Sequence, residues 1–361
     1  MRLTVEKTVF LLYYVIKISE KEGMGMAQNR VRIVDVADAL GLSTATVSKV
    51  IHGKTGKISD ETVKRVQQEL EKSGYIPNMA GILLARNNSR IIGVVVNDHV
   101  KYEDRVLEDG FVMASLNALS HEVNEKGYFL MIKTTSDISE IPVFASMWNM
   151  DGLILMGFCE ADYEKLRNQM RISFVVYDGY FEKCSKVVNL VIDHYDGGCQ
   201  AGKYFRELGH EKALCIADNF ICMDKERIEG FCKAFEPGET LIWQIPKTEK
   251  ERVCFYQDKF SELLKSNVTA VFAVSDFYAL EFMRFLQGKG IQIPGDIQII
   301  GFDDNMSSRE SNPALTPIHQ EASIRAKTAI KCLEAMRDGL DCETEIVLPV
   351  ELVKRESTRL L

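Results

Sequence analysis

The chain has 361 residues, more than one typical domain, and 46% of them are hydrophobic while 27% are charged. This composition is typical of a soluble, cytoplasmic, multi-domain protein with a sizeable core. Its nine cysteines form no CxxC pair and no Cys/His cluster, which favours reduced thiols over a disulfide framework or a zinc site. We expect neither a metal nor a cofactor.

The net charge of −8 is unevenly distributed along the chain. Residues 26–90 carry a net charge of +4 and residues 1–25 carry +1, so residues 91–361 carry −13. Such asymmetry is typical of a protein that presents a basic head to an anionic partner such as DNA and keeps an acidic body away from it.

Residues 1–25 contain the apolar run VFLLYYVIKI at positions 9–18. The run is too short to span a bilayer, which takes about 20 apolar residues. It could be a weak signal segment, a helix, or a stretch that is not translated. Lys21-Glu22-Gly23 must be encoded by a purine-rich stretch that resembles a bacterial ribosome-binding site shortly before the codon of Met26. We therefore hypothesise that translation starts at Met26.

Residues 33–52, IVDVADALGLSTATVSKVIH, carry the pattern of a helix-turn-helix. The first helix has apolar residues at i, i+3, i+4 and i+7, Gly41 allows a left-handed turn, and Ser43 is a suitable N-cap for the second helix. The expected buried positions are Ile33, Val36, Ala37 and Leu40, then Ala45, Val47, Val50 and Ile51. The expected outward positions are Thr44, Thr46, Ser48 and Lys49. Short hydroxyl and cationic side chains suit a helix in the major groove.

A third helix is expected from a cap at Ser59 to Ser73-Gly74, which completes a small domain over residues 26–76. Its expected buried positions are Val63, Val66, Leu70 and Tyr75. On periodicity alone, these three helices fit an ordinary packing unit as well as a DNA reader. Pro77-Asn78 then precede a short apolar helix and a polar linker that ends at Arg90.

Beyond Arg90 the chain alternates apolar strands with amphipathic helices, a pattern typical of a doubly wound parallel α/β fold. The expected strands form one set at 91–97, 128–132, 152–156, 172–177 and 187–192, and another at 213–217, 240–245, 268–274 and 297–302. Their continuous apolar character indicates helices on both faces. Two sets imply two lobes, and ligands of such sheets bind outside the carboxyl ends of strands, here in the cleft between lobes.

The segment DVADALGLSTATVSKVIHGKTGKISDETVKRVQQELEKSGYIPN resembles the head of the lactose-repressor (LacI/GalR) family of transcriptional regulators. Further landmarks similar to that family follow in the same order: DGLILMG at 151–157, RELGHEKALCIA at 206–217, KERIEGFCKAF at 225–235, AVSDFYALEFMRFLQGKGIQIPGDIQIIGFDD at 273–304 and LPVELVKREST at 348–358. Several motifs in the right order are far more specific than one short pattern.

The resemblance implies a helix-turn-helix DNA-binding domain over 26–76, a hinge helix and linker over 77–90, and an effector-binding domain over 91–361 that is similar to periplasmic sugar-binding proteins. It also implies that the chain crosses between lobes near 190, 318 and 345. The N-lobe would comprise about 91–190 and 319–345, and the C-lobe about 191–318 and 346–361.

The resemblance also assigns roles on DNA. Thr44, Ala45 and Lys49 match base-reading positions of the family, whereas Ser43, Thr46, Ser48 and His52 match phosphate contacts. Phosphate contacts position a protein and base contacts specify the site. Lys49 stands where many relatives carry arginine, and lysine donates to a guanine edge as a point charge rather than a bidentate fork.

Leu84 matches the leucine that relatives insert into the minor groove from the hinge helix. Gly81 departs from the family pattern. Glycine inside a helix costs about 1 kcal/mol relative to alanine, so we expect this hinge to order less readily than is usual in the family. Core packing under the sensor lobe is the alternative for this segment. A hinge used on DNA requires a homodimer on a pseudo-palindromic double-stranded operator.

The resemblance places Arg227 and Asp303 on the family's effector-contacting arginine and aspartate, and Ser275 and Asp276 on a second ligand-contacting turn. A carboxylate opposite an arginine fork suits the vicinal hydroxyls of a sugar, and the arginine suits a sugar phosphate as well. The two aspartates could instead cap helices. Three further polar residues end the first strand and could reach the cleft, although the family's usual aromatic residues are missing there: Asn97, Asp98 and His99.

These features predict a repressor of a carbohydrate-utilisation operon, switched by a sugar or sugar phosphate that binds its two conformational states with different affinities. Whether the ligand acts as inducer or co-repressor stays open at this point. The competing class is a sugar-binding transport receptor, which shares the two lobes but has no use for a basic head and needs an export signal. No GxSxG, GxxxxGK[ST] or HExxH motif indicates an enzyme.

Overall fold

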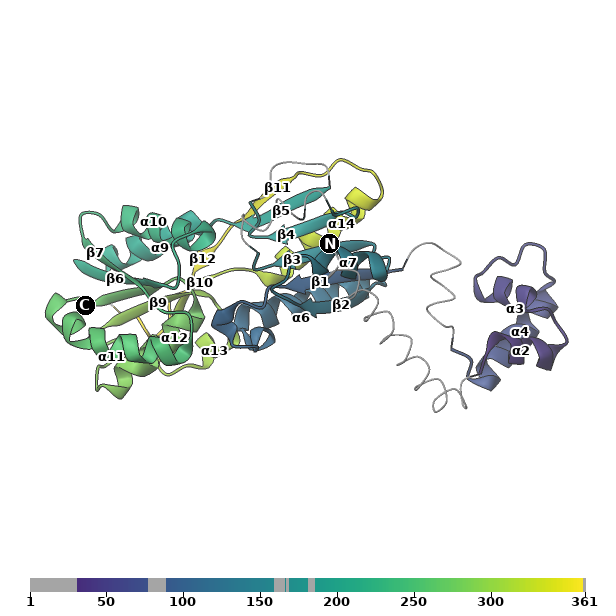
Figure 1. Ribbon diagram of the computed structural model, residues 1–361, viewed down its shortest axis with the longest axis horizontal. Helices are drawn as coiled ribbons and strands as arrows, with labels where there is room; N and C mark the ends of the chain where they lie inside the picture. The colour runs from purple at the N-terminus through teal and green to yellow at the C-terminus, as the bar shows by residue number, and fades with distance from the viewer. Residues whose placement is uncertain (1–30, 77–88, 159–165, 167–168, 181–185, 360–361) are drawn as a thin grey trace, which may run out of the picture. The chain divides into compact units, whose positions relative to one another are not determined.

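The computed structural model describes residues 31–76, 89–158, 166, 169–180 and 186–359. The chain divides into two compact units, Met1–Asn87 and Asn88–Leu361 (Figure 1). None of the described helices is both long and apolar enough to cross a membrane. The extension 1–25 and most of the hinge segment, including Gly81 and Leu84, lie outside the described residues.

The first unit is the expected set of three helices, formed by local signals. They are α2 (Ile33–Leu40), α3 (Thr44–Ile51) and α4 (Asp60–Ser73). Gly41 and Gly74 end α2 and α4 with φ values of 64° and 65°, which glycine adopts without a steric penalty. Ser43 and Ser59 cap α3 and α4, and the Oγ of Ser43 accepts from the Thr46 backbone N–H at 3.1 Å. The core consists of Val36, Ala37, Val47, Val50 and Val66.

Three side chains of α3 lie differently from the expectation, among them Ser48, which is half-buried rather than exposed. Ala45 is exposed rather than buried, because the buried face of this short helix is narrow and Val47 and Val50 fill it. Thr46 is half-buried rather than exposed, because its Oγ1 shares a hydrogen bond with Ser43 Oγ at 2.9 Å. The small alanine side chain thus belongs to the outer face of the helix.

The second unit contains two six-stranded sheets, each with its helices packed against both faces (Figure 1). The first sheet, which defines the N-lobe, has the order β11-β5-β4-β3-β1-β2 and is parallel throughout. Its strands are β1 (Ile91–Val96), β2 (Phe129–Thr134), β3 (Gly152–Met156), β4 (Phe174–Tyr177), β5 (Val187–Ile192) and β11 (Glu345–Leu348). Its helices are η1 (Val100–Tyr102), η2 (Val106–Glu108), α6 (Gly110–Glu125), α7 (Glu140–Met147) and α14 (Ala322–Arg337).

The N-lobe core follows the two-residue alternation of its strands. Ile92 and Val94 of β1 pack with α6 and α14, whereas Ile91 and Val95 pack on the opposite face with α7. Both faces of β1 are therefore buried, as its unbroken apolar sequence predicts.

The second sheet, which defines the C-lobe, has the order β12-β10-β9-β8-β6-β7, and only its β10–β12 pair is antiparallel. Its strands are β6 (Lys212–Ala217), β7 (Glu239–Gln244), β8 (Ala270–Ala273), β9 (Gln298–Asp303), β10 (Thr316–His319) and β12 (Glu351–Leu352). Its helices are α9 (His194–Glu207), α10 (Cys222–Phe235), α11 (Glu249–Ser266), α12 (Asp276–Gly288) and α13 (Met306–Glu310).

Helices α9 and α10 cross at glycines. A Cβ on Gly198 would overlap the carbonyl oxygen of Arg227, and a Cβ on Gly230 would overlap that of Tyr195. Only glycine therefore permits this backbone approach. The close crossing brings the first residue of α9, His194, beside Arg227 of α10.

The chain passes between the lobes three times, after β5, between β10 and α14, and after β11. The last crossing differs from the expected one near 345. Residues 346–348 belong to the N-lobe sheet, because Ile346 pairs with Leu190 and Leu348 pairs with Ile192.

Candidate functional site

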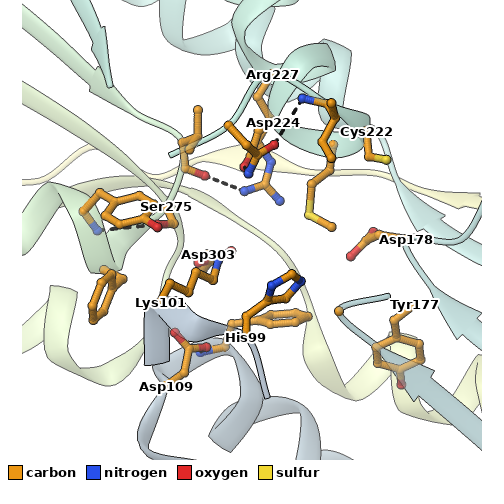
Figure 2. A pocket seen from close by; sticks show the side chains of 18 of the residues that line it. His99, Lys101, Asp109, Tyr177, Asp178, Cys222, Asp224, Arg227, Ser275 and Asp303 are labelled. Atoms are coloured by element: carbon orange, nitrogen blue, oxygen red, sulfur yellow. Dashed lines mark hydrogen bonds between the residues drawn. The ribbon is translucent and has the colours of Figure 1, made fainter. Parts of the chain in front are cut away.

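A cavity of about 130 Å³ lies between the two lobes, outside the carboxyl ends of strands from both sheets. Figure 2 shows side chains from both lobes converging on it. The lining residues labelled there are His99, Lys101, Asp109, Tyr177, Asp178, Cys222, Asp224, Arg227, Ser275 and Asp303. This position relative to the strands is where open α/β sheets bind their ligands.

Arg227 is buried on α10 and lines the cavity (Figure 2), and its guanidinium is held on several sides. The guanidinium carbon lies 3.6 Å from the ring centroid of Phe302, Nε donates to His194 Nδ1 at 3.1 Å, and Nη1 donates to the Val274 carbonyl. Within the described part of the chain, no group accepts a hydrogen bond from Nη2. The arginine is thus pre-positioned with one nitrogen left for a ligand.

His194 connects Arg227 to the N-lobe. Because Arg227 can only donate, Nδ1 of His194 must accept, and Nε2 carries the proton that it donates to Asp178 Oδ1 at 2.9 Å. Burial lowers the pKa of His194, the Asp178 carboxylate opposes this shift, and Arg227 adds to it. The neutral ring therefore relays a hydrogen bond from a C-lobe helix to the end of β4 in the N-lobe.

Arg325 on α14 joins this relay to Asp303. Its Nη2 lies 2.7 Å from Asp178 Oδ1, and its Nη1 donates to Gln320 Oε1 at 3.0 Å. Gln320 Nε2 in turn donates to Asp303 Oδ1 at 2.7 Å. Burial would raise the pKa of Asp178, but Arg325 and His194 outweigh burial and hold that pKa well below its ordinary value. Arg325 thus joins Asp178, the partner of His194, to Gln320, the partner of Asp303.

Asp303 closes β9 with a φ of 121°, a conformation that side-chain-bearing residues rarely adopt. Burial raises its pKa to about 7, with Arg227 opposing the shift and Asp109 adding to it. Burial also raises the pKa of Asp224 on α10 to about 6, against the effects of Arg227 and Lys101. Strained geometry and perturbed carboxyl groups in a cleft are features of a functional site.

Sequence reasoning missed several lining groups, among them Lys101 on η1 and Asp109 at the start of α6. Asp109 Oδ1 caps α6 by accepting from Phe111 and Val112 backbone N–H groups at 3.1 and 3.0 Å. Both residues follow β1 in a loop whose sequence has no periodic signal. Proximity to the end of β1 was the only clue to them, and it pointed correctly to His99, which lines the cavity.

Ser275 and Asp276 occupy different environments. Ser275 lines the cavity and caps α12 by accepting from the Tyr278 backbone N–H at 3.4 Å. Asp276 is fully buried outside the lining, where Oδ2 accepts from the Asn305 backbone N–H at 3.1 Å and Oδ1 packs on Gly301. Burial and the nearby Asp303 raise the pKa of Asp276 well above its ordinary value. Its position supports the loop after β9 rather than a ligand.

Two other expected residues also lie outside the lining. Asn97 is buried and donates through Nδ2 to the Gly157 carbonyl at 2.9 Å. Asp98 has a buried Oδ1 without a hydrogen-bond partner. Phe277 and Cys222, by contrast, line the cavity.

In the first unit, α3 presents one polar face to solvent. At about 100° per residue, Thr44, Ala45, Ser48 and Lys49 fall within a single arc, and all except the half-buried Ser48 are exposed. His52 follows the helix as its C-cap and is half-buried. This face carries short side chains around one cation, which allows close approach to base edges.

Comparisons with known proteins agree with both units. Residues 32–78 match the family described as bacterial regulatory proteins, lacI family, and residues 203–358 match the periplasmic binding protein-like domain. The chain is 30% identical over 352 residues to the HTH-type transcriptional regulator DegA of Bacillus subtilis (strain 168), covering 90% of this chain and 97% of DegA. It is 29% identical over 346 residues to the HTH-type transcriptional repressor PurR of Vibrio atlanticus (strain LGP32), covering 91% and 99%.

Solved structures share the fold. The Lac repressor dimer bound to operator and the anti-inducer ONPF has a TM-score of 0.76 at 22% identity, covering 91% of this chain and 99% of that one. The transcriptional regulator CelR in complex with cellobiose has a TM-score of 0.66 at 23% identity, covering 91% and 100%.

A helix-turn-helix head followed by a two-lobed ligand-binding body defines a transcriptional regulator with a built-in small-molecule sensor. The chain belongs to the LacI family of bacterial regulatory proteins.

Proposed function

We propose that this regulator is a cytoplasmic repressor without enzymatic activity, which binds a pseudo-palindromic operator as a homodimer and changes its operator affinity when a sugar binds between its lobes. The observation that carries the proposal is the inter-lobe cavity. Arg227, pre-positioned by His194, and Asp303, whose pKa is raised by burial, both line it. Among the similar structures, CelR is in complex with cellobiose, and a LacI family regulator from Enterococcus faecium has bound ribose.

The charges of the cavity favour a neutral sugar over a sugar phosphate. Among the described residues that line it, four carry carboxyl groups, Asp109, Asp178, Asp224 and Asp303, and two are lysine or arginine, Lys101 and Arg227. A sugar hydroxyl both donates and accepts, so it can bridge a carboxylate oxygen and an N–H group. A phosphate adds about two negative charges and only accepts, which places repulsion beside each of these carboxylates.

The switch is proposed to act through contacts that the two lobes make only in one arrangement. The Asp178–His194 hydrogen bond joins the two lobes beside the cavity, and Arg105 of the N-lobe lies 3.8 Å from Glu249 of the C-lobe. A sugar held by groups of both lobes stabilises the arrangement in which these pairs meet. The operator affinity then changes by as much as the sugar discriminates between the two states.

On DNA, Thr44, Ala45 and Lys49 are proposed to read bases, whereas Ser43, Thr46, Ser48 and His52 contact phosphates. The exposed face of α3 supports this assignment, because its outer residues are small enough for the helix to enter the major groove. Lys49 is the only cation of that helix. It is therefore the residue proposed to choose between guanine and other bases.

A second copy is proposed to cover an apolar surface of the N-lobe. Exposed apolar side chains occur on three consecutive elements, Met113 on α6, Phe129 and Ile132 on β2, and Val143 and Met147 on α7. β2 is an edge strand of its sheet, and exposed apolar edges are sites of association. Two heads held together in this way match an operator with two half-sites.

The test is fluorescence anisotropy of the chain started at Met26 on DNA from upstream of its own and neighbouring genes, with a panel of neutral sugars and sugar phosphates. We expect one fragment to bind specifically and a neutral sugar to change that binding, with the sign identifying inducer or co-repressor. Specific DNA binding that no sugar alters would contradict the effector assignment. Sugar binding without any DNA binding would favour a transport receptor.

A further inference from the structure

A second cavity of about 350 Å³ adjoins the first one. Four residues line both cavities, Lys101, Tyr102 and Asp109 from the N-lobe and Phe277 from the C-lobe. Figure 2 shows Lys101 and Asp109 at the N-lobe side of the first cavity. Because the two spaces share these walls, the cleft continues past Arg227 and Asp303 into a second compartment.

One wall of this compartment is a supported aromatic ring. Phe277 on α12 is 37% exposed, and the guanidinium carbon of Arg252 lies 5.2 Å from its ring centroid. Arg252 is itself fully buried, and its Nε and Nη2 each donate to the Glu281 carboxylate at 2.8 Å. This bidentate pair fixes the support under the ring. Leu280, one turn along α12, extends the apolar wall.

The rest of the compartment is polar and nearly balanced in charge. Its lining carries four cationic and five anionic side chains, of which Arg105 and Glu249 approach each other from opposite lobes at 3.8 Å. Arg284 is exposed on α12 at its edge. An apolar platform with donors and acceptors of both kinds around it suits an uncharged ring that carries hydroxyls, because such a ring has an apolar face and a polar edge.

We propose that the effector is an oligosaccharide of at least two units. One unit occupies the cavity at Arg227 and Asp303, and the next stacks on Phe277 in the second compartment. Pockets that bury a drug-sized ligand have volumes of about 300–1,000 Å³. The first cavity, at about 130 Å³, is smaller than such a pocket, whereas the first cavity together with the second, of about 350 Å³, lies within this range. This inference rests on the proposed sugar effector and specifies its length.

The experiment is isothermal titration calorimetry of the full chain with matched sugars. The ligands are maltose, cellobiose, lactose, trehalose, melibiose and sucrose, each compared with its own monosaccharides, glucose, galactose and fructose. We expect at least one disaccharide to bind ten or more times more tightly than either of its units. If a monosaccharide binds as tightly as every disaccharide containing it, the two-unit proposal is overturned while the sugar effector stands.

The second part of the experiment uses a variant in which a larger side chain fills the second cavity. Ser307 lines only the second cavity and is exposed on α13, so Ser307→Trp adds bulk there without disturbing the core. We expect this variant to bind the preferred disaccharide at least tenfold more weakly and its monosaccharide within about twofold of the wild type. Met306→Trp makes the same addition at a 71% exposed neighbour outside both linings and serves as the control.

Equal loss of both ligands in Ser307→Trp, or unchanged disaccharide binding in a correctly folded variant, would overturn the second subsite. A wild-type chain that binds none of these sugars, of either length, and none of the neutral sugars in the anisotropy panel, ribose included, would overturn the sugar effector itself.

Discussion

Replacing Asp303 by asparagine should stabilise the unliganded protein at pH 8 while removing its effector binding. Burial raises the pKa of Asp303 from an ordinary 3.8 to about 7. The folded wild type therefore loses free energy of unfolding as the pH rises above about 4, and the loss is complete above about pH 7. At about 1.4 kcal/mol for each pKa unit, the whole shift corresponds to about 4 kcal/mol. We expect about 2 kcal/mol, because the side chain is partly exposed at the cavity and water screens it.

The gain in the free energy of unfolding that Asp303→Asn brings depends on pH. Below about pH 4 the carboxyl is protonated in folded and unfolded chains alike, so the wild type carries no penalty and asparagine gives little advantage. As the pH rises from about 4 through 7, the unfolded chain releases the proton first and the wild type loses stability. The difference between variant and wild type should therefore grow by about 2 kcal/mol between pH 4 and pH 8.

The assay is urea unfolding at several pH values, followed by the fluorescence of Trp243 in the C-lobe core in a Trp148→Phe background. Asp258→Asn makes the same chemical change on the exposed face of α11 and is the control. A stability difference for Asp303→Asn that is the same at pH 4 and pH 8 would refute the reasoning. So would a variant that still binds the sugar as tightly as the wild type.

Lys49→Ala should reduce the discrimination between operator and mutated operator by about 1–3 kcal/mol, measured by anisotropy competition, because it removes a base contact. Gly110→Ala should weaken sugar binding at least tenfold in calorimetry, because its Cβ would lie 2.6 Å from Nδ2 of the buried Asn305 and keep the lobes apart. His194→Ala should also weaken sugar binding at least tenfold, because Arg227 loses the acceptor that orients it.

Each of these substitutions has a matched control. Lys57→Ala removes the same charge from an exposed loop of the head and should weaken all DNA fragments alike. Gly288→Ala adds a methyl group where no atom lies within 4 Å. Tyr195→Ala truncates the exposed neighbour of His194. A control that changes its own readout as much as the test variant would remove the support for the assigned role.

Local sequence signals predicted most helices and strands, but they could not predict strands that form by pairing with segments far away in the sequence. The turn at Gly41 and the caps at Ser43 and Ser59 follow from residues within a few positions of each other. Apolar runs between helices predict the strands β1 to β9. β10 contains a proline and β12 has two residues, so their places in the sheet depend on neighbours far away in sequence.

The candidate site divides in the same way. Asp303 ends β9 and Ser275 caps α12, where a sequence pattern can indicate them, whereas Arg227 lies in the second turn of α10 and was indicated by the family resemblance. All three line the cavity. Arg325 acts through Gln320 and through Asp178, which follows another strand. No spacing in the sequence predicts the role of Arg325, because this side chain contacts Asp178, which lies more than a hundred residues away in the chain.

The most direct test of the account is whether sugar and operator binding are coupled reciprocally. The operator Kd is measured by anisotropy with and without saturating sugar, and the sugar Kd is measured by calorimetry with and without saturating operator. A sensor linked to a DNA reader requires the same factor in both directions, typically 5-fold to 150-fold. Sugar that binds the cavity with an affinity unchanged by operator, and leaves the operator Kd unchanged, would contradict the account.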